Sequence, residues 1–62
     1  MFPANTRILF ADDAQTSRHL LRHLLGQLGF DKLFEATDGT EAFKLLSAQS
    51  QAGEPIELII SD

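Results

Sequence analysis

The sequence predicts an α/β fold in which parallel strands alternate with helices in the order βαβαβ. Two apolar runs, residues 6–11 and 56–61, are short, rich in Ile, Leu and Phe, and each is followed by aspartate. Between them, two segments with apolar residues at helical spacing flank a third short apolar run. Because parallel strands need crossover connections, this alternation favours a parallel sheet with right-handed crossovers.

The first strand is predicted over residues 6–11, where a continuous apolar run is typical of a strand buried on both faces. A helix follows, because leucines recur at helical spacing and form one apolar stripe. The leucines of this stripe are Leu20, Leu21, Leu24, Leu25 and Leu28. Thr16 or Ser17 is expected to cap the start of this helix, and Gly29 suits the position just past its end. The opposite face carries the polar residues Arg18, Arg22 and Gln27.

The second strand is predicted over residues 32–37, and Asp38-Gly39 ends it. Asp38 and Glu41 have the spacing of a capping box at the start of a second helix. The apolar residues of this helix are Ala42, Phe43, Leu45 and Leu46, and the pattern fades into the polar residues 47–53. Pro55 then marks the entry to the third strand, residues 56–61.

In a unit of this kind the first strand usually lies in the centre, which gives the strand order 2-1-3. The carboxyl ends of strands 1 and 3 then meet at one edge of the sheet, so Asp12, Asp13 and Asp62 are expected to converge. Three close carboxylates are typical of a divalent cation site or of a chemically active acid cluster. The alternative for Asp12-Asp13 alone is a solvated loop in which one aspartate supports a helix N-terminus.

Composition excludes several classes of function. The chain has 62 residues, no cysteine and a net charge of −4, so it allows one small domain with neither disulfides nor a thiolate metal site. The basic residues are scattered, which argues against nucleic-acid binding, and no apolar stretch is long enough to cross a membrane. No signal peptide is evident, and a cytoplasmic protein is expected. His19 and His23 are four residues apart but lack an evident third ligand, which favours surface histidines over a metal site.

Four segments, taken in order, carry a family resemblance. They are RILFADD, SRHLLRHLLGQLGF, EATDGTEAFKLL and ELIISD, and together they cover the chain from Arg7 to Asp62. They resemble the first half of a response-regulator receiver domain and are most similar to the single-domain chemotaxis type. The resemblance implies a flavodoxin-like, doubly wound parallel sheet, of which residues 1–62 are a truncated receiver domain without the C-terminal half.

The resemblance also implies roles for the three aspartates. Asp62 is the expected phosphoacceptor in a phosphorelay, receiving a phosphoryl group from a histidine kinase or phosphotransfer protein. Asp13 and Asp62 are expected to bind Mg²⁺ directly, and Asp12 is expected to act on the cation through water. The family is a phosphoacceptor rather than an enzyme acting on other molecules. The family's backbone-carbonyl ligand, hydroxyl residue and lysine beyond Asp62 have no counterpart here, so phosphotransfer by this chain alone is not expected.

Two other functional interpretations stay open. The first is a non-signalling half-domain that folds by self-association, as a homodimer, through the exposed edge of the third strand. The second is an Asp-nucleophile phosphatase of the dehalogenase type. That class usually needs another aspartate two residues past the nucleophile, and the Asp12-Asp13 pair also fits it poorly.

Overall fold

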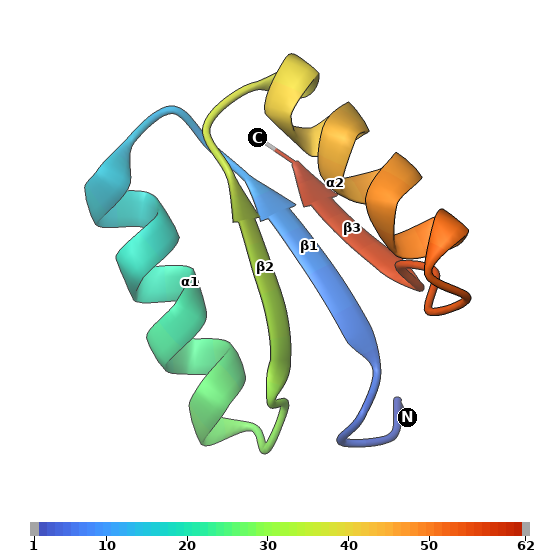
Figure 1. Cartoon of the computed structure of the whole chain (residues 1–62). Coiled ribbons are helices and arrows are strands. Elements are labelled where there is room, and N and C mark those ends of the chain that lie inside the picture. The colour runs from blue at the N-terminus through green and yellow to red at the C-terminus, as the bar shows by residue number, and fades with distance from the viewer. Residues whose placement is uncertain (1, 62) are drawn as a thin grey trace.

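The computed structural model describes residues 2–61 and has the element order that the sequence predicts (Figure 1). The elements are β1 (Arg7–Ala11), α1 (Gln15–Gln27), β2 (Lys32–Ala36), α2 (Gly39–Gln51) and β3 (Leu58–Ser61). All three strands are parallel, and the sheet order is β2-β1-β3, which confirms the predicted order 2-1-3. The helices lie on opposite sides of this sheet.

The register of the strands decides which side chains share a face. Phe10 of β1 is paired with Glu35 of β2 and with Ile60 of β3, and these residues lie on the α1 side. Ala11 is paired with Ala36 and Ser61, which lie on the α2 side. Because all three strands run in one direction, their carboxyl ends lie together at one edge of the sheet.

The core is centred on β1. Ile8, Leu9 and Phe10 are each 0% exposed, because β1 has a strand on both edges and a helix over each face. On the α1 side the core includes Leu25, and half-buried apolar side chains pack against it. These are Leu21, Phe30, Leu33, Leu58 and Ile60. Burying one large apolar side chain contributes roughly 1.5–3 kcal/mol, so β1 supplies much of the stability of this small fold.

Helix α1 buries only part of its predicted apolar stripe. Leu25 is buried and Leu21 is half-buried, whereas Leu20, Leu24 and Leu28 are 57%, 46% and 73% exposed. Arg18, predicted on the opposite face, is packed instead, with its side chain 14% exposed. The face of α1 that meets the sheet therefore includes Arg18, which pairs with Glu35 on β2, and excludes three of the five predicted leucines.

The helix ends confirm one predicted cap and correct another. The N-cap of α2 is Asp38, whose Oδ1 accepts from the Glu41 backbone N–H at 2.8 Å, as predicted. The N-cap of α1 is Ala14, without a side-chain cap, so the predicted cap at Thr16 or Ser17 is wrong: both residues lie inside the helix. Gly29 follows α1 with φ +98°, a left-handed conformation that glycine adopts without a steric cost.

The third strand begins at Leu58 rather than at residue 56, because side-chain contacts hold the segment before it. The Arg7 Nε–H donates to the Pro55 carbonyl at 2.7 Å. The Glu57 carboxylate accepts from the Arg7 backbone N–H at 3.1 Å and lies 3.6 Å from the Arg7 guanidinium. These contacts tie the approach to β3 to the start of β1. No helix within residues 2–61 is long and apolar enough to cross a membrane.

Candidate functional site: an acidic hollow at the carboxyl end of the sheet

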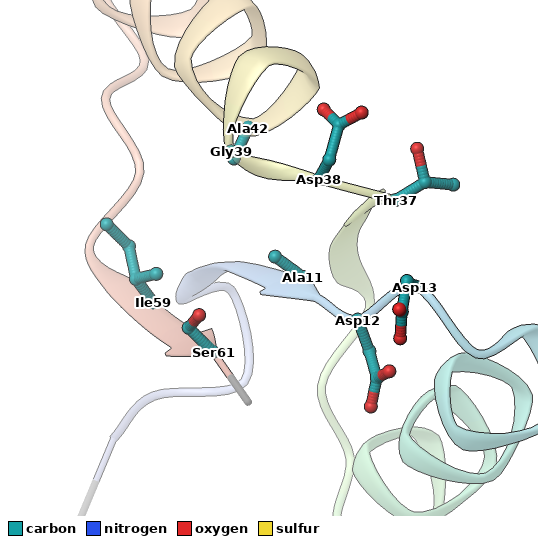
Figure 2. A pocket seen from close by; sticks show the side chains of 9 residues that line it. All are labelled: Ala11, Asp12, Asp13, Thr37, Asp38, Gly39, Ala42, Ile59 and Ser61. Atoms are coloured by element: carbon teal, nitrogen blue, oxygen red, sulfur yellow. The ribbon is translucent and has the colours of Figure 1, made fainter.

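An open hollow of about 290 Å³ lies where the strands end, on the α2 side of the sheet (Figure 2). Its lining comes from the β1–α1 loop, the β2–α2 loop, the start of α2 and the end of β3. The lining residues are Ala11, Asp12, Asp13, Thr37, Asp38, Gly39, Ala42, Ile59 and Ser61. The sequence-predicted pair Asp12-Asp13 therefore lies at the predicted edge of the sheet.

Asp12 is held at the end of β1 by its neighbours. Its backbone N–H donates to the Ala36 carbonyl of β2 at 3.1 Å. One carboxylate oxygen, Oδ1, accepts from the Ala14 N–H at 2.9 Å, which is an Asx turn at the start of α1. One side-chain oxygen is thus engaged in shaping the loop, and the other is left to face water or a hydrated cation.

Asp13 is exposed, and among residues 2–61 no group donates a hydrogen bond to its carboxylate. A carboxylate without an internal partner keeps all its lone pairs for solvent or a cation. The Asp13 carboxylate is thus available to an external ligand, and the metal-binding roles expected for Asp12 and Asp13 stay predictions.

The third acid in the lining, Asp38, has a structural task. Its carboxylate caps α2 through the Glu41 N–H, and the Glu41 carboxylate in turn accepts from the Thr37 N–H at 2.8 Å. The first bond satisfies one of the donors that the start of a helix leaves without partners, and the second holds Thr37, the residue before the cap. Asp38 and Glu41 add negative charge near the hollow, while one oxygen of each carboxylate is already used in these bonds.

The predicted third member of the cluster, Asp62, lies outside the described residues. The residue before it, Ser61, is paired with Ala11, the residue before Asp12, and Ser61 also lines the hollow. Within residues 2–61, no three His, Asp or Glu side chains gather closely enough to hold a metal ion. The described part of the chain thus supplies two acids of the predicted three.

The donor set fits a hard divalent cation. Carboxylate and hydroxyl oxygens line the hollow, and Mg²⁺ takes oxygen ligands while keeping several of its waters. An open hollow of this size has room for a partly hydrated ion. The residues that would hold Mg²⁺ here are Asp13 directly and Asp12 through water.

The histidine pair on α1 behaves as the sequence predicts. His19 and His23 are exposed and line a shallow surface groove with Thr16, Ser17 and Leu20. Within residues 2–61, no third acid or histidine joins them. They are surface histidines away from the acidic hollow.

Sequence reasoning missed the polar contacts behind the hollow. Arg18 donates to the backbone carbonyl of Asp12 at 2.7 Å and pairs with Glu35, so a residue predicted on the polar face of α1 touches the site. Two hydroxyl residues of the lining, Thr37 and Ser61, were also not predicted as site residues. Their positions directly after β2 and at the end of β3 were the available signal.

Comparison with known proteins finds bacterial chemotaxis proteins. A probable chemotaxis protein CheY of Rhizobium etli is 41% identical over 56 residues, which are 90% of this chain and 40% of that protein. A chemotaxis protein CheY homologue of Campylobacter jejuni subsp. jejuni is 34% identical over 56 residues, with the same coverage. The chain thus spans about 40% of the length of the curated relatives that it matches. No protein-family model matches the chain, and no solved structure matches it significantly.

Proposed function

The chain is a homologue of CheY-type receiver domains over 90% of its length, and on this premise we propose that it is the acidic, phosphoryl-accepting part of a two-component receiver. In this proposal Asp62 is the phosphoacceptor, Asp13 and Asp62 bind Mg²⁺ directly, and Asp12 acts through water. The partner is a histidine kinase or a phosphotransfer protein. The domain receives the phosphoryl group and does not act as an enzyme on other molecules.

One observation carries the proposal. β1 and β3, each followed by aspartate, are neighbours in the sheet, and their last residues are paired. Ala11 and Ser61 are register partners, and each is followed in sequence by aspartate. Like charges placed together cost free energy unless a cation or a proton compensates them. The arrangement therefore favours a cation-binding function over a solvated loop.

The chemistry follows from the charge of the reactants. An oxygen of the Asp62 carboxylate attacks the phosphorus of the donor, a P–O bond forms, and the bond from phosphorus to the donor breaks. Both reactants are anionic, so the step needs positive charge at the phosphoryl oxygens. Mg²⁺, when bound, supplies that charge. Asp13 would hold the cation, and Asp12 would act on it through water.

The remaining groups of a receiver are needed for full activity. The carbonyl ligand, hydroxyl and lysine that the family places beyond the acceptor aspartate are not among these 62 residues. Each charged contact to a transferred phosphoryl group contributes several kcal/mol in the transition state. The phosphorylation proposal therefore concerns this chain together with the groups that the family places beyond the acceptor aspartate.

The first test is titration of the chain with Mg²⁺, followed by the backbone amide signals of Asp13 and its neighbours. We expect saturable binding that Asp13→Asn weakens by at least about tenfold, because the variant loses the unpartnered carboxylate. Asp31→Asn is the matched control: it removes the same charge from an exposed aspartate in the loop between α1 and β2. Equal affinity for the wild type and Asp13→Asn would contradict the assigned role.

The second test concerns the phosphoryl group. The chain, combined with a complementary receiver half, is incubated with a small acyl phosphate and Mg²⁺, and its intact mass is measured. One added phosphoryl group is expected, absent in Asp62→Asn and absent when the cation is chelated. Labelling that persists in Asp62→Asn would show that another residue accepts the group.

A second function, self-association, is favoured by a separate observation. β3 has a sheet neighbour on one edge, and large apolar side chains are exposed on both sides of the sheet. They include Leu20, Leu28, Phe43 and Ile59. An open strand edge with exposed apolar side chains is a template for association, and a twofold dimer is the simplest closed form. Native mass spectrometry over a dilution series tests it: a folded monomer that persists on dilution would exclude the dimer.

A further inference from the structure

Arg18 links α1 to two other parts of the fold. Its Nη1–H donates to the backbone carbonyl of Asp12 at 2.7 Å, and its Nε lies 3.5 Å from Oε1 of Glu35. Its side chain is only 14% exposed, whereas that of Arg22, one turn later on the same helix, is 46% exposed. A packed guanidinium costs free energy unless its donors find acceptors, and here the acceptors lie on β2 and on the β1–α1 loop.

Glu35 orients this guanidinium. It stands on β2 opposite Phe10, and its carboxylate receives the Arg22 Nε–H at 2.6 Å as well as the ion pair with Arg18. Arg22 contacts Oε2, and Oε1 is the oxygen that pairs with Arg18. The planar fork of arginine then directs a second N–H toward the Asp12 carbonyl.

The Asp12 carbonyl belongs to the peptide unit that joins Asp12 to Asp13. Because a peptide unit is planar, fixing its carbonyl also fixes the direction in which Asp13 leaves the strand. Asp12 has two further contacts, from its N–H to the Ala36 carbonyl and from the Ala14 N–H to its Oδ1. The Arg18 contact is the one made by a side chain from another element.

From this geometry we infer that Arg18 is a positioning residue, which holds the β1–α1 loop in the shape that presents Asp12 and Asp13 to a cation. The inference rests on the Mg²⁺ site proposed above. It assigns Arg18 no contact with the cation or with the phosphoryl group. Arg18 acts through the Asp12 carbonyl, and Glu35 acts through Arg18.

The direction in which Mg²⁺ affinity changes when Arg18 is replaced distinguishes a positioning role from electrostatic repulsion of the cation. A guanidinium close to a cation site repels the cation, so removing its charge alone would strengthen Mg²⁺ binding. Loss of positioning has the opposite effect, because the loop must then be ordered when the ion binds. Lysine keeps the charge but cannot bridge Glu35 and Asp12 with a planar fork.

The test compares Arg18→Ala, Arg18→Lys and the matched control Arg22→Ala. Arg22 lies on the same helix and pairs with the same Glu35, but it donates to the Leu33 carbonyl instead of to Asp12. Two quantities are measured on each chain: the hydrogen-exchange rate of the Ala14 amide, and the dissociation constant for Mg²⁺. The amide of Leu25, a buried residue of α1, serves as the internal reference for global stability.

For Arg18→Ala we expect exchange at Ala14 to accelerate about fivefold or more relative to Leu25, and Mg²⁺ affinity to fall about tenfold. For Arg18→Lys we expect each effect to be more than half as large as in Arg18→Ala, when the fold-changes are compared on a logarithmic scale. Arg22→Ala is expected to change both quantities by less than about twofold. If Arg18→Ala does not fold, the lysine variant decides, because it retains the charge and the packed stem.

Two results overturn the inference: unchanged relative exchange at Ala14 in the Arg18 variants, or a rise in Mg²⁺ affinity on removal of Arg18. Failure of the proposed cation site has a different signature. In that case the wild-type chain shows no saturable Mg²⁺ binding, while the exchange rate at Ala14 still reports whether Arg18 holds the loop.

Discussion

Strands β1 and β3 have similar sequences, RILFA and LIIS, but very different surroundings. In β1 the three apolar residues Ile8, Leu9 and Phe10 are 0% exposed. In β3 the side chains alternate between half-buried and exposed, and Ile59 is 52% exposed. Both strands point the same way and end at the same hollow.

The difference arises from the number of neighbours. β1 lies between β2 and β3 and has a helix over each face, whereas β3 has β1 on one edge and, within residues 2–61, no strand on the other. An apolar sequence therefore indicates a strand, but its position in the sheet decides how much stability that strand contributes.

The strongest test of this comparison is Leu9→Ala in β1. The substitution leaves a cavity in a fully buried position, which typically costs 2–5 kcal/mol, a large part of the stability of so small a domain. Urea unfolding followed by circular dichroism measures the loss, and an unfolded variant is within the expected range. A loss below about 1 kcal/mol would show that β1 is not the packed centre of the fold.

Ile59→Ala in β3 is the matched substitution, because Ile59 is the register partner of Leu9 on the same face of the sheet. We expect a loss of about 1 kcal/mol or less at low protein concentration, since half of the side chain is already in water. A partner that covers β3 changes this result: the loss then grows with protein concentration, because folding and association are linked. Unfolding measured over a concentration series separates the two cases.

The smallest expected loss of stability comes from weakening the contact between Arg7, at the start of β1, and Glu57, just before β3. Glu57→Gln weakens the 3.6 Å ion pair with Arg7 and keeps the shape of the side chain. Because both side chains are partly exposed, the expected loss is about 0.2–1 kcal/mol, and it should shrink as salt is added. A loss that is independent of salt would instead implicate the hydrogen bond from the Arg7 N–H to Glu57.

The elements of the fold could be predicted from the sequence because their signals are local. The spacing of the apolar residues and the turn-forming residues predicted the strands and helices to within a few residues. Asp38 and Gly29 mark helix ends as predicted. The helix-capping prediction at Thr16 or Ser17 failed because the Asx turn of Asp12 starts α1 earlier. The position of Asp12-Asp13 at the sheet edge was predictable too, since parallel strands that alternate with helices place their ends together.

What the sequence by itself determined, then, is the order βαβαβ, the parallel sheet and the pair of acids at its carboxyl end. Only the tertiary structure decided which leucines of α1 are covered and where Arg18 reaches. An i, i+4 pattern sets which residues share a helix face, but the rotation of that face depends on what the helix packs against. Here the face that meets the sheet carries Leu21, Leu25 and the Arg18 side chain paired with Glu35, and Leu20, Leu24 and Leu28 are left exposed.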